Sequence, residues 1–173
     1  MRNMSRAMAL CGMTAALSLV LMLLGSALAL FTYACPMLVG MLLLFIREEL
    51  GVKWSVTLWL AISLLAFMLV PELEMTAVFL GIFGWYPSLK PVLDKFPKIL
   101  GWCGKLLLFN GAAAAVYAVL MQVMGMEDMP GSLVGWAVLF AAANLVFCCY
   151  DLVLTRTKGV MVPVLHHFFQ RIP

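Results

Sequence analysis

Residues 7–46 read AMALCGMTAALSLVLMLLGSALALFTYACPMLVGMLLLFI, and none of these side chains is charged. The small residues Gly25–Ala27 divide the stretch into two apolar runs, Ala7–Leu24 and Leu28–Ile46. A transmembrane helix needs about 20 predominantly apolar residues to cross a hydrocarbon core about 30 Å thick. The stretch therefore predicts two membrane-spanning helices joined by a short loop.

The rest of the chain repeats this pattern, with short polar segments between the apolar runs. Hydrophobic residues make up 65% of the 173 residues and charged residues 11%, which is typical of an integral membrane protein. We therefore predict an all-α fold, a single membrane domain over residues 1–173 built as a six-span helix bundle, with a tail at 155–173. The four further predicted spans are Val52–Val70, Met75–Leu89, Ile99–Met124 and Ser132–Leu154.

All 11 Lys and Arg residues fall on one side of this six-span topology. The loops on the opposite side, Gly25–Ala27, Pro71–Glu74 and Gly125–Gly131, carry only acidic charges. Because Lys and Arg in short loops set membrane orientation, both termini are expected in the cytoplasm of a multi-pass protein of the cell (plasma) membrane. The net charge of +3 reflects this bias, so membrane lipid is an expected partner and nucleic acid is not.

Motifs for catalysis or metal binding are absent from the sequence. The five cysteines include no CxxC pair, and the two histidines, His166 and His167, are adjacent and point about 100° apart on a helix. Glu48-Glu49 resembles the paired glutamates of prenyl-protein proteases but lacks the arginine and histidines that accompany them. We therefore predict a protein that is not an enzyme, without a metal or another cofactor.

Small residues form a stripe along the first predicted span. Gly12 and Ala16 recur at helical spacing, and Cys11 and Ala15 lie beside them. Such stripes let two helices approach closely inside lipid. Two interpretations stay open: the stripe packs against this protein's own helices, or it docks onto a separate membrane subunit.

The fourth predicted span is unusual because Met75–Leu89 is short and contains Pro87. Proline removes a hydrogen-bond donor and clashes with the preceding helical turn. The sequence predicts a short helix that ends in an irregular stretch over Gly81–Pro87. Such backbone persists at membrane depth only where protein shields it or it faces water, so this span indicates a cavity or a moving part, with Trp85 and Tyr86 at the inner boundary of a shielded environment. A local thinning of the bilayer, with Lys90 reaching toward the headgroups, stays open as the alternative. The basic connector Lys90–Lys98 then reads as a helix lying on the inner leaflet, or as a docking surface for a cytoplasmic partner.

Polar residues inside the last two spans are few. Asn144 and Asp151 are seven residues apart and share a helix face, where Asn110 could join them. Charges at membrane depth need partners, and Lys105 or Arg156 could neutralise Asp151. We predict a buried polar network of Asn110, Asn144, Asp151 and Lys105.

Taken together, six spans, cytoplasmic termini and the stripe of Gly12, Ala16, Cys11 and Ala15 resemble the substrate-binding S components of energy-coupling factor transporters. That resemblance implies uptake of a small molecule and docking of the stripe onto a transmembrane coupling subunit with ATPase subunits. It also implies a substrate site in the outer half, covered by segments that map to Phe31–Tyr33, Pro71–Thr76 and Met126–Gly131. The residues expected to bind substrate are Tyr33, Glu72 and Glu74.

A second function stays open. The chain could be a non-transporting accessory or assembly protein whose cytoplasmic partner docks at Lys90–Lys98 and the tail. A polar pocket in the outer half would favour transport. A tightly packed outer half with an exposed basic face would favour the accessory role.

Overall fold

Helices form every element of the part of the chain that the computed structural model describes, residues 2–28, 31–124 and 133–170. The all-α prediction is confirmed for these residues. The helices are α1 (Arg2–Leu28), α2 (Ala34–Leu50), α3 (Val52–Leu69), α4 (Leu73–Val78), the π-helix η1 (Phe79–Phe83), α5 (Tyr86–Leu93), α6 (Lys98–Met124) and α7 (Leu133–Gln170).

Four helices of the described part are long and apolar enough to cross a membrane. The other two predicted spans differ from them: α2 has 17 residues and ends in the charged segment Arg47–Glu49, and the fourth span is divided into α4, η1 and α5. The structure thus supports a membrane protein, and the six-span topology stays a prediction. The four candidates are Met4–Leu28, Val52–Leu69, Lys98–Val123 and Val134–Gly159.

Two predicted boundaries are wrong. Residues Gly25–Ala27, predicted as a loop, lie inside α1. The reason is packing, because a Cβ atom on Gly25 would overlap the Sγ atom of Cys35, so this glycine lets α2 approach α1. At the other end of the chain, α7 continues beyond Leu154 to Gln170, so the segment predicted as a tail is largely helical.

The irregular stretch predicted over Gly81–Pro87 is present as part of η1 and the turn at Gly84 and Trp85, but Pro87 is not its cause. Proline is tolerated in the first turn of a helix, where its missing N–H has no partner to lose, and Pro87 lies in the first turn of α5. The departure from α-geometry comes earlier, in η1, where the Gly84 N–H donates to the Phe79 carbonyl oxygen at 2.8 Å. The Trp85 Nε1–H donates to the Gly81 carbonyl oxygen at 2.7 Å and covers this turn.

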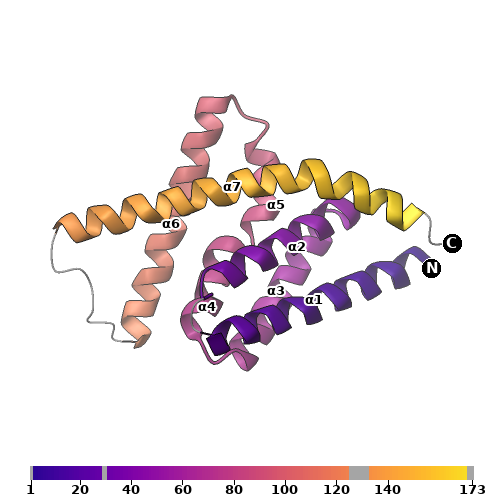
Figure 1. The fold of residues 1–173 in the computed structure, drawn as a ribbon, viewed down its shortest axis with the longest axis horizontal. Helices are drawn as coiled ribbons and strands as arrows, with labels where there is room; N and C mark the ends of the chain where they lie inside the picture. Colours follow the sequence, from indigo (N-terminus) through magenta and orange to yellow (C-terminus); the bar gives the residue numbers. More distant parts are fainter. Residues whose placement is uncertain (1, 29–30, 125–132, 171–173) are drawn as a thin grey trace.

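Helix α2 lies between two buried apolar clusters. On one side it packs with α1 and α3, where Val39, Leu43 and Ile62 are fully buried. On the other side it meets α5, η1 and α7, whose aromatic side chains pack around the Tyr150 ring. In Figure 1, α7 passes across α6, and the start of α1 and the end of α7 lie on the same side of the molecule.

Gly40 of α2 makes the closest of these approaches. A Cβ atom there would overlap the Tyr150 hydroxyl and lie 2.8 Å from the carbonyl oxygen of Phe83. Only glycine therefore lets α2 meet α7 and η1 at this point, because interiors are packed too densely to absorb an extra carbon.

Candidate functional site

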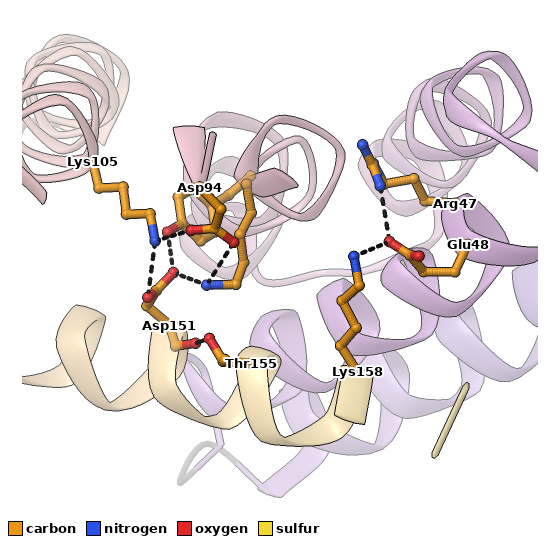
Figure 2. Close-up of polar contacts among 9 residues, drawn as sticks. Arg47, Glu48, Asp94, Lys105, Asp151, Thr155 and Lys158 are labelled. Carbon is orange, nitrogen blue, oxygen red and sulfur yellow. Dashed lines mark hydrogen bonds and ion pairs between the residues drawn. The ribbon is translucent and has the colours of Figure 1, made fainter. Parts of the chain in front are cut away.

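A buried carboxylate, Asp151 of α7, is the centre of a charged cluster. Lys90 of α5 and the Tyr86 hydroxyl both donate to its Oδ1 atom. Lys105 of α6 places its Nζ atom 3.2 Å from Oδ2 (Figure 2). Only 2–5% of the surface of Lys90, Lys105 and Asp151 is exposed. The cluster thus joins three helices through charged groups that are withdrawn from water.

Asp94, at the end of α5, completes the charge balance. Its Oδ1 atom lies 2.5 Å from the Lys105 Nζ atom, and its Oδ2 atom lies 3.7 Å from the Lys90 Nζ atom. Asp94 is exposed, so the two lysines bridge a buried and an exposed carboxylate. Two positive and two negative groups cancel, which is the condition for holding charge at this depth.

The structure brings part of the predicted polar network together. Lys105 reaches Asp151, whereas Arg156 forms no ion pair with a described residue. Asn110 and Asn144 form a separate pair, in which each side-chain amide donates to the other's oxygen at 2.9 and 3.1 Å. This amide pair joins α6 to α7 and makes no hydrogen bond to Asp151 within the described part of the chain.

Sequence reasoning placed Tyr86 in a shielded environment but did not connect Tyr86 or Lys90 to Asp151, and it placed Lys90 at the surface, which is wrong. Tyr86, Lys90 and Asp94 follow one another at four-residue spacing, so they share one face of α5. This spacing could have indicated that the three residues act together. It has that meaning only if the segment is helical, which requires reading Pro87 as part of the first turn of a helix. The segment Lys90–Lys98 was predicted as an inner-leaflet helix or a docking surface. Its first lysine, Lys90, is buried, while Lys95 and Lys98 are exposed.

A second ionic group ties α2 to α5 and α7. Glu48 accepts from Arg47 at 2.9 Å and from Lys158 at 3.0 Å, as Figure 2 shows. The Arg47 Nε–H also donates to the Ser88 carbonyl oxygen at 3.1 Å. These contacts fasten the basic ends of three helices to one another.

The residues expected to bind substrate form hydrogen-bonded pairs at the other ends of the helices. The Tyr33 hydroxyl donates to Glu74 at 2.6 Å and lies 2.9 Å from the Tyr117 hydroxyl of α6. The Thr32 hydroxyl donates to Glu72 at 2.6 Å. The segment Met126–Gly131, which the resemblance maps to the same region, lies outside the described residues.

An apolar groove of about 500 Å³ opens between α3, the α4–η1 segment and α6. Its walls are aliphatic and aromatic except for two hydroxyl-bearing residues, Ser63 and Thr76. The Thr76 hydroxyl donates to the Glu72 carbonyl oxygen at 3.3 Å. Ser63 is 3% exposed, and its hydroxyl has no hydrogen-bond partner among the described residues. The lining residues are Leu60, Ser63, Leu64, Phe67, Leu73, Thr76, Ala77, Leu80, Val119, Leu120 and Val123.

The small-residue stripe of α1 divides into two parts. Cys11 and Ala15 pack against the core cluster of α1–α4, whereas Gly12 and Ala16 are exposed. A Cβ atom on Gly12 would meet nothing within 4 Å in the described part of the chain. The protein's own helices therefore leave half of the stripe uncovered.

Comparisons with protein-family models, curated proteins and solved structures found no match to this chain. Among the side chains that the structure describes, those of residues 4–28, 31–123 and 134–159, no three of His, Cys, Asp or Glu lie close enough to hold a metal ion. The charged cluster, the carboxylates of Glu72 and Glu74 and the groove are therefore the features of this chain that bear on its function.

Proposed function

We propose that this chain is a small membrane transport component, similar to an S component, that binds a small molecule in the groove between α3, the α4–η1 segment and α6. The groove carries the proposal because its volume of about 500 Å³ lies in the range of small-molecule sites. It also contains the buried, unpartnered hydroxyl of Ser63, a group that a ligand could satisfy. The predicted substrate residues Glu72 and Glu74 flank Leu73, the first groove residue of α4.

The walls define the solute. A nearly apolar lining binds the carbon skeleton of a ligand through removal of apolar surface from water, with few polar contacts to orient it. A strongly polar small molecule would leave its hydrogen-bonding groups unpaired against these walls. The solute proposed here has a large apolar part.

The experiment that tests this function fills the groove. Ala77 lines it, so Ala77→Phe should exclude the solute, whereas Ala61→Phe places the same ring at an exposed position of α3 outside the lining. Protein purified in mild detergent is analysed by mass spectrometry for retained small molecules. We expect a molecule that the wild type and Ala61→Phe retain and that Ala77→Phe loses while remaining folded. Equal retention by both variants would contradict the groove as the site.

The proposed topology has six spans in the plasma membrane with both termini in the cytoplasm. It is supported by the one-sided distribution of the 11 basic residues. Reporter fusions at Glu72 and Asp128 should read as external, and fusions at Glu49, Lys95 and Arg171 as internal. A single reversed position would refute this arrangement.

The uncovered part of the α1 stripe is the proposed contact for a transmembrane coupling subunit with ATPase subunits. Because Gly12 and Ala16 are exposed, Gly12→Leu or Ala16→Leu should leave the fold intact, as measured by an unchanged unfolding temperature. The same variants should lose a co-purifying membrane partner, since a leucine prevents the close approach of a second helix. Unchanged co-purification of that partner would remove the stripe from the contact.

A further inference from the structure

The acidic groups beside the groove have no cationic partner. Neither Glu72 nor Glu74 forms an ion pair with a described residue, and each accepts one hydrogen bond from a hydroxyl. The second carboxylate oxygen of Glu72, Oε2, is buried and accepts no hydrogen bond from the described residues. A buried carboxylate oxygen that accepts no hydrogen bond is destabilising. The site lacks a positive charge.

The helices that form the groove cannot supply that charge. Between Trp54 and Leu89, and again between Leu106 and Thr155, the sequence contains no Lys or Arg. All the basic groups of the charged cluster are engaged at the other ends of these helices. The helices that form the groove therefore offer the glutamates no positive partner, and a ligand with a cationic group would provide one.

The glutamates do not line the groove, but they adjoin it at the start of α4, where Leu73 lies between them in the sequence. Leu73 and Thr76 line the groove, and the Thr76 hydroxyl contacts the Glu72 backbone. Tyr117, which lies within hydrogen-bond distance of Tyr33, is three residues from the lining residue Leu120 on α6. A ligand that extends along the groove past Leu73 would bring one end close to the carboxylates. Ser63, whose buried hydroxyl has no partner among the described residues, lies along the groove.

We infer that the ligand is a cationic amphiphile, a free molecule whose apolar body fills the groove and whose protonated amine or ammonium group lies against Glu72 and Glu74. This inference rests on the proposed function and names its substrate class. Charge complementarity selects the head group, and the apolar walls select the body.

The test compares two photoreactive probes of equal chain length, diazirine-bearing hexadecylamine and diazirine-bearing hexadecanol. The full-length protein is placed in nanodiscs of phosphatidylcholine at pH 7, and labelled residues are mapped by mass spectrometry. We expect the amine to label groove residues at least about tenfold more than the alcohol, since hydrogen bonds to charged groups contribute about 1.5–3 kcal/mol. Excess unlabelled hexadecylamine should compete.

Glutamine variants distinguish loss of the negative charge beside the groove from disruption of the fold. Glu72→Gln combined with Glu74→Gln should reduce amine labelling to the level of the alcohol, while alcohol labelling stays unchanged and reports an intact groove. Glu49→Gln removes an acidic group at the basic end of α2 and should change neither.

Each remaining outcome overturns a defined claim. Equal labelling by amine and alcohol in the wild type would overturn the cationic ligand and leave the proposed function standing. Competition by phosphatidylethanolamine as strong as that by hexadecylamine would assign the groove to a membrane lipid and overturn the free ligand. Groove labelling by neither probe would overturn this inference, and loss of a retained molecule in Ala77→Phe would still support the proposed function.

Discussion

Replacement of Asp151 by leucine should destabilise the protein by about 3–5 kcal/mol, because it leaves two buried ammonium groups without their shared carboxylate. Lys90 and Lys105 both contact Asp151, and the exposed Asp94 is the only other acidic group beside them in the described residues. For a chain of this size, 1 kcal/mol corresponds to about 2–4 °C in unfolding temperature. Thermal unfolding in mild detergent should therefore show a decrease of about 6–20 °C.

Two further variants test the cause of that loss. Adding Lys90→Met to Asp151→Leu removes one of the orphaned charges and should recover part of the stability. Lys158→Met breaks the partly exposed pair with Glu48 and should cost less than about 1 kcal/mol. An unfolding temperature of Asp151→Leu within a degree of the wild type would show that the cluster is not a buried ionic group.

Gly40→Ala should destabilise the protein by about 1–3 kcal/mol, the usual cost of overpacking. The added Cβ overlaps the Tyr150 hydroxyl and approaches the backbone of η1 at Phe83. Gly12→Ala is the matched control, because it lies in a helix interior with nothing within 4 Å and should be neutral or stabilising by up to about 1 kcal/mol. The measurement is the unfolding temperature of both variants.

A second substitution localises the clash at Gly40. Tyr150→Phe deletes the hydroxyl that the new Cβ meets first, so the double variant should regain part of the lost stability. The recovery is incomplete because the Phe83 carbonyl oxygen belongs to the backbone and cannot be removed. A Gly40→Ala protein as stable as Gly12→Ala would show that α2 and α7 do not meet there.

The helices of this fold follow from the sequence, while several of their ends do not. Long apolar runs predict α3 and α6 to within one residue at each end. Gly25 is a turn former by its chemistry, but in the fold it provides space for Cys35, a role that depends on a partner distant in the sequence. The length of α7 could not be predicted either. The first polar residues after an apolar run mark the end of a membrane span, but a helix can continue beyond them.

The charged cluster was only partly predictable for a related reason. Lys105 and Asp151 lie on long regular helices, so their depths follow from counting residues along each helix. Lys90 lies beyond a π-helix, and no residue pattern reveals how far such a segment rotates the helix after it. The fourth predicted span was expected to border a cavity, and its residues Thr76, Ala77 and Leu80 line the groove. The other walls could not be predicted, because the groove exists where side chains from three elements fail to fill the space between them.

The π-helix η1 has a consequence for how this chain tolerates change. Its i→i+5 bonding accommodates one residue more than an α-turn does, and each α-helical residue turns the chain by about 100°. The residues before it face the groove, and Tyr86 and Lys90 after it face α7. The extra residue in η1 thus fixes the rotation of the helix face that carries Tyr86 and Lys90 relative to the face that lines the groove. Substitution of one apolar residue for another in η1 keeps this rotation unchanged. Insertion or deletion of a single residue in η1 turns one of the two faces away from the residues that it contacts.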